Sequence, residues 1–382
     1  MDKHIKGNMR AGTFINQLEG DATYKAFVQN NLPLELRVDE KLQGLLSKAD
    51  LAIGRLDSVA EFLPDIDFFI LMYVRKEATV SSQIEGTQAT FIDVLKKEAK
   101  IDEGEVHKDV NEVINYIRAM NYGLSKLQEL PLSLRLLKDI HAKLLTGVRG
   151  EHKTPGQFRT SQNWIGGPSI NTATFIPPPA NQVVSLMGNL EDYMHSFLST
   201  PVLIKIGLIH AQFETIHPFL DGNGRIGRLL ITFYLCQQRT LHKPLLYLSV
   251  FFKKHRQIYY DRLNDFRAKD DIEGWLAFFL QGIIDTSEQA VETARKIIHL
   301  REIGIKKVST FGRSTEKAMT IYHYLFRSPM IRVKDVEQIV KITNPAALAL
   351  VNKFLQGGIL KELTGFKRNR VFSFADYVTL FE

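Results

Sequence analysis

The chain has 382 residues, more than one ordinary domain needs, so two or three domains are expected. Apolar residues make up 45% and charged residues 24%, as in water-soluble globular proteins, and no apolar run approaches the roughly 20 residues of a membrane span. A single cysteine, Cys236, excludes an intrachain disulfide framework, and we expect it in the core of a cytoplasmic protein.

The net charge of +7 is concentrated at the C-terminal end. Residues 301–382 contain 14 Lys and Arg against 7 Asp and Glu, whereas the rest of the chain contains 35 of each. A basic unit on a neutral body predicts a separate module with a partner of its own.

The N-terminal part begins with an arm and two helices. Residues 1–37 contain three glycines and scattered aromatic residues, and we expect an irregular arm that packs on the body. Apolar residues then recur at helical spacing over residues 38–62 and again over residues 65–85. This spacing predicts two amphipathic helices, which Pro64 separates.

The second helix ends in the polar stretch Ser81-Ser82-Gln83-Ile84-Glu85-Gly86. Gly86 is a natural C-cap, because glycine readily adopts the left-handed conformation that often follows the last helical turn. Ser81 and Glu85 are four residues apart and share one face of the helix. Taken alone, the pattern indicates only a helix end with a solvated glutamate.

The next region combines helices with a long loop. Three helices are predicted, at residues 91–99, 106–130 and 132–145. Residues 146–180 are rich in glycine and proline, and Trp164-Ile165-Gly166 and Ala173-Thr174-Phe175-Ile176 predict the two short strands of a hairpin. In a chain this helical, such a loop is typical of a lid or a docking edge, with a purely structural excursion as the alternative.

The most informative stretch is Ile216–Arg228, with the sequence IHPFLDGNGRIGR, between predicted helices at residues 202–216 and 226–235. Glycines before a helix let backbone N–H groups converge on an anion, and the helix dipole adds to the attraction. Arg225 and Arg228 are three residues apart, so they leave the helix on one face and can hold one polyphosphate together. The stretch predicts a phosphate cradle.

Asp221 and His217 add chemistry to this cradle. A carboxylate repels phosphate unless a divalent cation lies between them, and magnesium accepts carboxylate and phosphate oxygens as ligands. We therefore expect Asp221 to hold magnesium. His217 precedes the loop and is placed to take a proton from an attacking group.

Helical patterns continue beyond the cradle. Helices are predicted at residues 181–197, 250–266 and 271–303. The second of these carries Tyr259, and the third is long enough to reach the C-terminal unit.

From residue 315 the pattern predicts a winged helix. Its helices are expected at residues 318–326, 333–340 and 345–355, with Asn344 as the cap of the last helix. Wing strands are expected at residues 359–363 and 370–374, on either side of Lys367 and Arg368. This architecture commonly binds DNA. The presumed recognition helix, however, is mostly Ala, Leu and Val, with Asn352 and Lys353 as polar exceptions, which is poor for base readout. DNA binding through residues 315–382 and a protein contact both remain open.

Residues His217 to Arg228 match the signature His-Pro-Phe-x-Asp/Glu-Gly-Asn-Gly-Arg-x-x-Arg at every specified position, and the chain resembles the Fic family. Ser81-x-x-x-Glu85-Gly86 is similar to the family's inhibitory helix motif, placed N-terminal to the core as in one class of Fic proteins. Residues 154–180 are similar to the family's flap, and a terminal winged helix also occurs in this class.

The resemblance implies adenylylation, in which AMP passes from ATP to a Ser, Thr or Tyr hydroxyl of a protein and pyrophosphate leaves. His217 would be the base and Asp221 the magnesium ligand. Flap residues Trp164, Ile165, Thr174 and Phe175 would pair with an extended target segment. Nucleotide contacts are expected from Glu85, His217, Gly222, Asn223, Gly224, Arg225, Ile226, Gly227, Arg228 and Tyr259. A structural ion pair for Arg225 and a core position for Tyr259 remain alternatives.

The resemblance also implies regulation through Ser81, Glu85 and Gly86. Glu85 would pair with Arg228 and block the productive pose of the γ-phosphate, because a carboxylate claims the donors that phosphate needs. Alternatively, Glu85 would orient a water that removes AMP, which makes the site bifunctional. A third hypothesis is a nucleotide-responsive DNA-binding regulator.

The expected fold is mainly α: a Fic-type helical bundle with a small β-hairpin flap, followed by a winged helix. Four segments are expected: residues 1–100 as arm and helical region with the inhibitory helix, 101–270 as Fic core, 271–310 as linker helix and 311–382 as winged helix. The expected partner is a protein whose side-chain hydroxyl is modified, and the chain itself is one candidate for this target. Members of this class often form dimers, so a homodimer is a further expectation.

Overall fold

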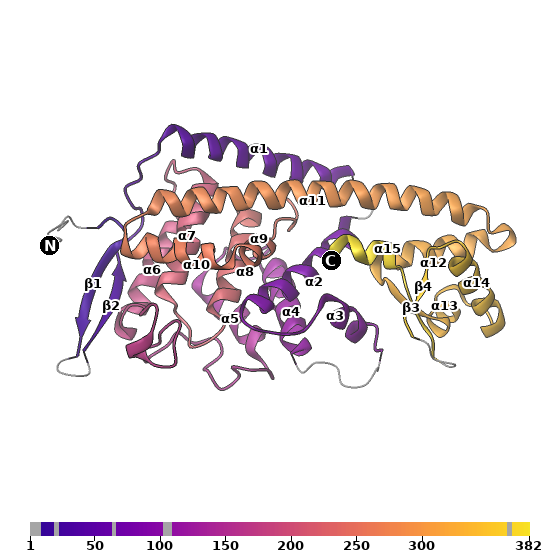
Figure 1. Cartoon of the computed structure of the whole chain (residues 1–382), viewed down its shortest axis with the longest axis horizontal. Coiled ribbons are helices and arrows are strands. Elements are labelled where there is room, and N and C mark those ends of the chain that lie inside the picture. The colour runs from indigo at the N-terminus through magenta and orange to yellow at the C-terminus, as the bar shows by residue number, and fades with distance from the viewer. Residues whose placement is uncertain (1–8, 19–22, 63–65, 102–108, 365–368) are drawn as a thin grey trace.

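The computed structural model describes residues 9–18, 23–62, 66–101, 109–364 and 369–382, and these are mostly helical with two small antiparallel sheets (Figure 1). The predicted fold class, mainly α with small β elements, is confirmed. Pro64, Lys367 and Arg368 lie outside the described residues. Within the described ranges, no helix is long and apolar enough to cross a membrane.

The N-terminal arm is a β-hairpin, so the expected irregular structure is wrong for this segment. Strands β1 (Gly12–Gln17) and β2 (Tyr24–Gln29) pair antiparallel. The seemingly scattered aromatic residues face each other across the strands, with the Phe14 and Phe27 ring centroids 5.0 Å apart. The hairpin packs on α7 (Val202–Ile216), as expected of the arm.

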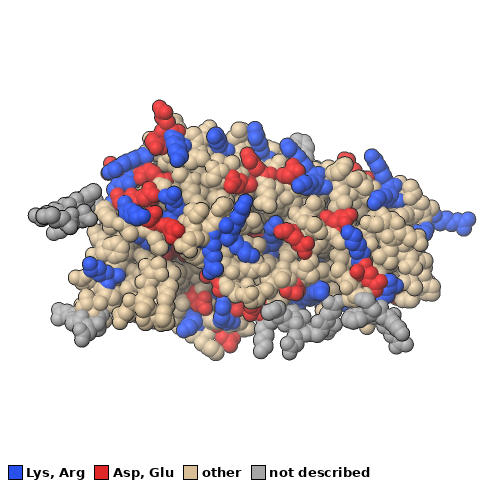
Figure 2. All heavy atoms as spheres, in the orientation of Figure 1, with Lys and Arg blue, Asp and Glu red and all other residues tan. Residues whose placement is uncertain are grey.

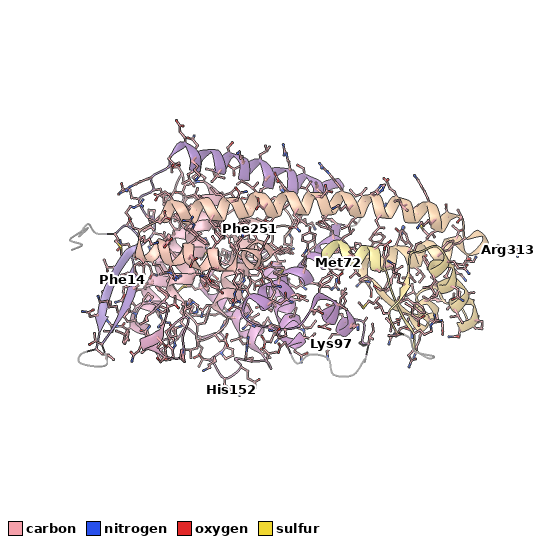
Figure 3. All side chains as sticks on the ribbon, in the orientation of Figure 1. Phe14, Met72, Lys97, His152, Phe251 and Arg313 are labelled. Carbon is pink, nitrogen blue, oxygen red and sulfur yellow. The ribbon has the colours of Figure 1, made fainter. Side chains whose placement is uncertain are left out.

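Two long helices run along one side of the body (Figure 1). Helix α11 (Ile272–Ser309) lies against α1 (Glu40–Phe62) and extends to α12 (Thr315–Arg327) of the C-terminal unit. Trp275, Phe279 and Ile283 recur at helical spacing in α11 and are fully buried. Figure 3 places Phe251 beneath α11, where its ring centroid lies 5.0 Å from that of Phe278.

Helix α2 (Ile66–Ile84) packs on α4 (Val110–Lys126), which in turn packs on α5 (Leu134–Leu145). Gly86 follows α2 with a φ of 96°, and the Gly86 and Thr87 N–H groups donate to the Gln83 and Ser82 carbonyls at 3.1 and 3.2 Å. This pattern is a Schellman motif, so the predicted cap at Gly86 is confirmed. Helix α3 (Phe91–Glu98) follows.

The remaining helices of the body surround α7, whose residues are almost all buried. They are α6 (Val183–His195), α8 (Asn223–Gln237), α9 (Ser249–Lys254) and α10 (Arg256–Ala268). The single helix expected at residues 250–266 is in fact α9 and α10, because His255 leaves helical geometry. Cys236 in α8 is half-buried, and burial raises the pKa of its thiol to about 12.

The hairpin predicted within residues 146–180 is reduced to one β-bridge, between Ile165 and Phe175, around the 3-10 turn Ile170–Thr172 (η2). Gly166 has a φ of 72°, and a Cβ there would lie 2.5 Å from Thr174 Oγ1. Residues 177–179 are prolines, which have no N–H to donate to a ladder. Longer strands are therefore excluded on both sides of the bridge. A second short 3-10 turn, Ala180–Gln182 (η3), leads into α6.

The C-terminal unit has its predicted helices and its two predicted strands in the predicted order. The elements are α12 (Thr315–Arg327), β3 (Met330–Arg332), α13 (Val333–Val340), α14 (Asn344–Gln356), β4 (Lys361–Glu362), β5 (Val371–Ser373) and α15 (Ala375–Val378), with short 3-10 turns at Gly312–Ser314 (η4) and Thr379–Phe381 (η5). The sheet order is β3-β5-β4, and β3 was not predicted. Asn344 is the first residue of α14 rather than its cap, which is Thr343.

The C-terminal unit is in contact with the body through α2 and α11. Phe381 packs against Phe69 and Tyr73 of α2, with ring centroids 6.4 and 5.4 Å apart. Met72 lies where α2 approaches this unit (Figure 3). On the face drawn in Figure 2, acidic and basic side chains alternate over the unit, and no continuous basic surface is visible there.

Candidate active site

His217 ends helix α7 in an unusual conformation. Its φ and ψ are 49° and 60°, a left-handed geometry that disfavours residues other than glycine. Its N–H donates to the Phe213 carbonyl at 2.9 Å, and its own carbonyl accepts from Arg159 Nε at 3.0 Å and Asn163 Nδ2 at 3.2 Å. These bonds hold the backbone of His217 against the strain.

The ring of His217 is held in its neutral form. Burial lowers the pKa of His217 to about 4, and the Arg267 guanidinium acts in the same direction. The imidazole is therefore neutral near pH 7 and can act as a base. Its Nδ1 atom lies 4.0 Å from Glu214 Oε2.

Glu214 is a site residue that the sequence did not single out. It lies three residues before His217, and burial raises the pKa of its carboxyl to about 7. Its Oε1 atom has no hydrogen-bond partner among the described residues. A Cβ on Gly227 would lie 2.3 Å from this oxygen, so the glycine between the two arginines leaves room for Glu214. The only signal in the sequence was its spacing from the histidine.

The glycine-rich loop prepares the N-terminus of α8 for an anion. Gly222 has a φ of 78° at the N-cap, so α8 begins at Asn223, three residues earlier than predicted. The Asn223 side chain accepts from the Phe219 N–H and donates to the Phe219 carbonyl, both at 2.8 Å, and thereby braces the loop. The first N–H groups of a helix have no acceptor within it and can bind phosphate. Ile226 is fully buried.

Asp221 is the carboxylate of this loop. Its Oδ1 accepts from the Gly222 N–H at 2.6 Å and lies 3.4 Å from Arg225 Nη2, and about a third of the side chain is exposed (32%). No cluster of three or more His, Cys, Asp or Glu side chains suited to a metal exists in the described part of the chain. A magnesium ion held by Asp221 would take its other ligands from phosphate and water, which is common for this ion. This role of Asp221 stays a prediction.

His141 supports the loop from α5, and the sequence did not indicate it. The Gly156 N–H donates to its Nδ1 at 2.8 Å, so its Nε2 carries the proton and donates to the Asp221 carbonyl at 2.9 Å. Its ring stacks on Phe219 with centroids 3.8 Å apart. Burial lowers the pKa of His141 to about 4.

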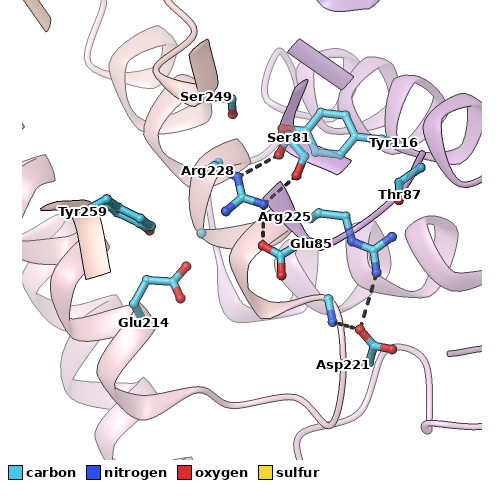
Figure 4. A network of polar contacts seen from close by, with 12 residues as sticks. Ser81, Glu85, Thr87, Tyr116, Glu214, Asp221, Arg225, Arg228, Ser249 and Tyr259 are labelled. Atoms are coloured by element: carbon cyan, nitrogen blue, oxygen red, sulfur yellow. Dashed lines mark hydrogen bonds and ion pairs between the residues drawn. The ribbon is translucent and has the colours of Figure 1, made fainter. Parts of the chain in front are cut away.

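Arg225 is buried but incompletely paired (Figure 4). Its Nη1 lies 3.6 Å from Glu112 Oε2, and its Nε and Nη1 have no hydrogen-bond partner among the described residues. Glu112 on α4, which the sequence also did not single out, accepts from Thr87 Oγ1 at 3.2 Å as well. A desolvated guanidinium with free donors favours an incoming anion.

Arg228 is paired more completely, and its partners are Ser81 in α2 and Glu85 directly after that helix (Figure 4). It donates from Nε to Ser81 Oγ at 2.8 Å and from Nη2 to the Ser81 carbonyl at 3.0 Å and to Glu85 Oε1 at 2.7 Å. Burial opposes the ionisation of Glu85, but Arg228 outweighs it and lowers the pKa of the carboxyl. A Cβ on Gly224 would lie 2.3 Å from Glu85 Oε1, so Gly224 leaves room for this carboxylate.

Tyr259 lies beside the site within an aromatic cluster. It is 1% exposed, donates to His210 Nε2 at 2.9 Å and stacks on Phe252 with centroids 4.4 Å apart. His210 Nδ1 in turn donates to the Gly227 carbonyl at 2.9 Å. The position is that of a core residue, and a contact with adenine stays a prediction.

The flap, residues 154–180, has an exposed and a buried side. Trp164 is 41% exposed, whereas Phe175 is buried. The guanidinium carbon of Arg267 lies over the Phe175 ring, 3.8 Å from the ring centroid. The Thr174 N–H donates to the Ile165 carbonyl at 2.9 Å. The β1–β2 hairpin joins the flap, because the Phe27 N–H donates to the Ile176 carbonyl at 3.0 Å.

The helical fold and the loop with His217, Asp221 and both arginines define a Fic-type site. Two family models match the chain: "Fic/DOC family N-terminal" over residues 43–125 and "Fic/DOC family" over residues 131–235. The chain belongs to the Fic/DOC family.

Curated relatives match the chain over part of their length. The protein adenylyltransferase Fic of Drosophila willistoni is 28% identical over 215 residues, which is 55% of this chain and 39% of that protein. A probable protein adenylyltransferase of Aquifex aeolicus is 32% identical over 181 residues, or 45% of this chain and 51% of that protein. The chain thus matches about half or less of either relative.

A solved structure shares the fold over nearly the whole chain. A Fic family protein from Desulfovibrio desulfuricans, 19% identical, superposes with a TM-score of 0.59 and covers 88% of this chain and 97% of its own. A Fic domain containing signaling protein from Bacteroides thetaiotaomicron has a TM-score of 0.50 over 67% of this chain.

Proposed function

We propose that this protein is a protein adenylyltransferase, which transfers AMP from ATP to a side-chain hydroxyl of a protein and releases pyrophosphate. The observation that carries the proposal is a neutral histidine, His217, at the end of α7, followed by a glycine-rich loop and by two buried arginines on α8. The names of the curated relatives point to the same reaction.

In the proposed reaction, the target hydroxyl oxygen attacks the α-phosphorus of ATP. A new oxygen–phosphorus bond forms, the bond from the α-phosphorus to the bridging oxygen breaks, and pyrophosphate leaves. His217 takes the hydroxyl proton, and the N–H groups at the start of α8 stabilise the charge that develops on the α-phosphate. Arg225 and Arg228 hold the phosphate tail. Asp221 would hold magnesium, which supplies positive charge beside the phosphate oxygens.

We propose that the conformation with Glu85 on Arg228 is a resting state. The 2.7 Å contact occupies a donor that the γ-phosphate would need, and Ser81 holds the rest of the guanidinium. The same carboxylate, once free of Arg228, could orient water for removal of AMP. Both roles, inhibition and AMP removal, would belong to Glu85. A pulse–chase experiment separates the two roles.

The test uses ATP labelled on the α-phosphate, cell lysate as the source of targets, and the Glu85→Gly protein. We expect label on protein, and a loss of about 10²- to 10⁴-fold when His217→Ala is added. His299→Ala, which removes an exposed histidine of α11, is the matched control and should keep the label. Equal labelling with and without His217 would overturn the proposal.

We do not extend the proposal to DNA binding by residues 315–382. In the C-terminal unit Arg332 pairs with Asp335, and Arg370 pairs with Glu362. The exposed residues of α14 include Ala346, Leu348 and Ala349, which offer no hydrogen bonds to base edges. The expected architecture and the local positive charge favour DNA binding, and a gel shift with the whole protein tests it.

A further inference from the structure

Arg159 is a buried cation that the proposed mechanism does not use. It lies in the flap, is 2% exposed and has no carboxylate partner among the described residues. Its guanidinium instead donates to four backbone carbonyls. The acceptors are His217 at 3.0 Å from Nε, Ser161 at 3.1 Å from Nη1, and Pro178 and Ile216 at 2.6 and 3.2 Å from Nη2.

These carbonyls belong to two separate parts of the site. Ile216 and His217 end α7, where the last carbonyls have no donor within the helix and where the helix dipole favours a cation. Ser161 and Pro178 lie on the two legs of the flap, before and after the bridge of Ile165 with Phe175. One side chain therefore ties both legs of the flap to the backbone of the histidine.

Neighbouring bonds repeat the connection. The Arg159 N–H donates to the Pro218 carbonyl at 2.8 Å. Asn163, four residues further along the same leg, donates from Nδ2 to the carbonyls of His217 and Phe219 at 3.2 and 3.0 Å. The segment after His217 is thus held from the flap along its length.

We propose that Arg159 is a positioning residue that fixes His217 relative to a target segment bound on the flap. This inference rests on the proposed adenylyl transfer. A base must lie within hydrogen-bond reach of the proton that it takes, and a misplacement of about 1 Å can cost roughly 10²-fold in rate. Arg159 fixes the position of the flap relative to His217, so that the hydroxyl of a target segment bound on the flap lies within reach of the imidazole.

Lysine at position 159 separates positioning from a general need for positive charge. Lysine keeps the charge but has one nitrogen, which cannot reach carbonyls on both flap legs and on α7 as the planar guanidinium does. The hydrogen bonds of Arg159 reach Ile216, His217 and Pro218 but not the glycine loop or the two arginines of the cradle, so the affinity of the protein for ATP should be unaffected by the substitution.

The experiment measures ATP affinity and label transfer separately in the Glu85→Gly background. Calorimetry with ATP and magnesium gives the affinity, and initial rates with α-labelled ATP give kcat and the KM for ATP. For Arg159→Lys we expect kcat to fall about 10- to 100-fold while ATP affinity changes less than about 3-fold. Arg332→Lys, a paired arginine in the C-terminal unit, is the matched control and should change neither quantity.

A second variant keeps the test decisive if Arg159→Lys does not fold. Asn163→Ala removes two bonds to the same segment and should show the same split, with a kcat loss of about 3- to 10-fold. An unchanged kcat, or a parallel loss of ATP affinity, would show that this part of the flap has a structural role only. Absence of label in the Glu85→Gly parent would instead count against adenylyl transfer itself.

Discussion

Arg225 and Arg228 leave the first turn of α8 three residues apart, but their surroundings differ. Around Arg228, Ser81 and Glu85 accept three hydrogen bonds of 2.7 to 3.0 Å. Around Arg225, the carboxylates of Asp221 and Glu112 stand at 3.4 and 3.6 Å, and Nε and Nη1 have no hydrogen-bond partner among the described residues. One arginine is satisfied by the chain itself, and the other is desolvated with free donors.

The difference assigns different roles to two residues that look interchangeable in the motif. A phosphate that reaches Arg225 gains hydrogen bonds without displacing any, because the cost of removing water from the guanidinium is already met in the fold. A phosphate that reaches Arg228 must first displace Glu85. Arg225 should therefore determine affinity for the nucleotide, and Arg228 should determine whether the bound nucleotide is productive.

Among the tests of this difference between the two arginines, the largest effect is expected from replacing each arginine by methionine in two backgrounds. Arg225→Met should weaken ATP binding roughly 10- to 100-fold in both the wild type and Glu85→Gly, because it removes charged hydrogen bonds. Arg228→Met should weaken binding by that factor only in Glu85→Gly. Calorimetry with ATP and magnesium on the resulting proteins measures both. Similar losses for Arg228→Met in the two backgrounds would remove the distinction between the arginines.

Acid should lower the free energy of unfolding through the surroundings of both arginines, because a buried neutral histidine supports the backbone near each of them. His141 supports the Asp221 carbonyl and His210 supports the Gly227 carbonyl, and burial lowers their pKa values from 6.5 to about 4 and about 3. Unfolding below pH 6.5 takes up a proton at each, so the free energy of unfolding falls as the pH drops. Each histidine contributes about 2 kcal/mol to this fall between pH 7 and pH 5.

Urea unfolding at pH 7 and pH 5 measures this effect. His141→Gln and His210→Gln should each be less stable than the wild type at pH 7 but should lose less stability on acidification. A pH dependence identical to that of the wild type in both variants would contradict the assignment of neutral histidines.

The residues of the predicted cradle could be placed together from the sequence because they lie close along the chain. Glycines, carboxylate and arginines lie within one helix–loop–helix, so spacing alone places them together, and the long helices followed from apolar periodicity. The start of α8 was misplaced by three residues, since Gly222 adopts a left-handed N-cap and draws Asn223 and Gly224 into the helix. The β1–β2 hairpin was missed because its aromatic pairs become visible only across strands.

The residues that support the loop and the arginines could not be identified from the sequence, for a different reason. Glu112 and His141 are single polar residues on the amphipathic helices α4 and α5, where no local pattern distinguishes them from solvated side chains. Glu214 lies on α7, whose residues are almost all buried, and the sequence does not show which groups surround it there. Their roles arise from tertiary packing, as does the contact of Glu85 with Arg228 across 143 residues. That pair was anticipated only through the family resemblance.

The Glu85→Gly substitution directly tests the role of the hydrogen bond between Arg228 and Glu85. Removing the carboxylate frees a donor of Arg228, and we expect label transfer from ATP to protein to rise about 10-fold, the worth of one charged hydrogen bond. Mass spectrometry after incubation with ATP in lysate scores the gain of AMP. A chase without ATP should show equal persistence of AMP with either protein if Glu85 only inhibits. Faster loss with the wild type would assign AMP removal to Glu85, and unchanged labelling would contradict the resting state.

The smallest effect separates two adjacent serines of α2. Ser81 and Ser82 are both fully buried, but Ser81 Oγ accepts from Arg228 Nε at 2.8 Å, whereas Ser82 Oγ has no partner among the described residues. Ser81→Ala should loosen Arg228 from α2 by about 1 kcal/mol and raise label transfer about 5-fold. Ser82→Ala removes an equal volume without a hydrogen bond to Arg228, so its rate should match the wild type. Because both changes act on one helix turn, equal rates for the two variants would mean that the Ser81 hydroxyl does not help to hold Arg228 at rest.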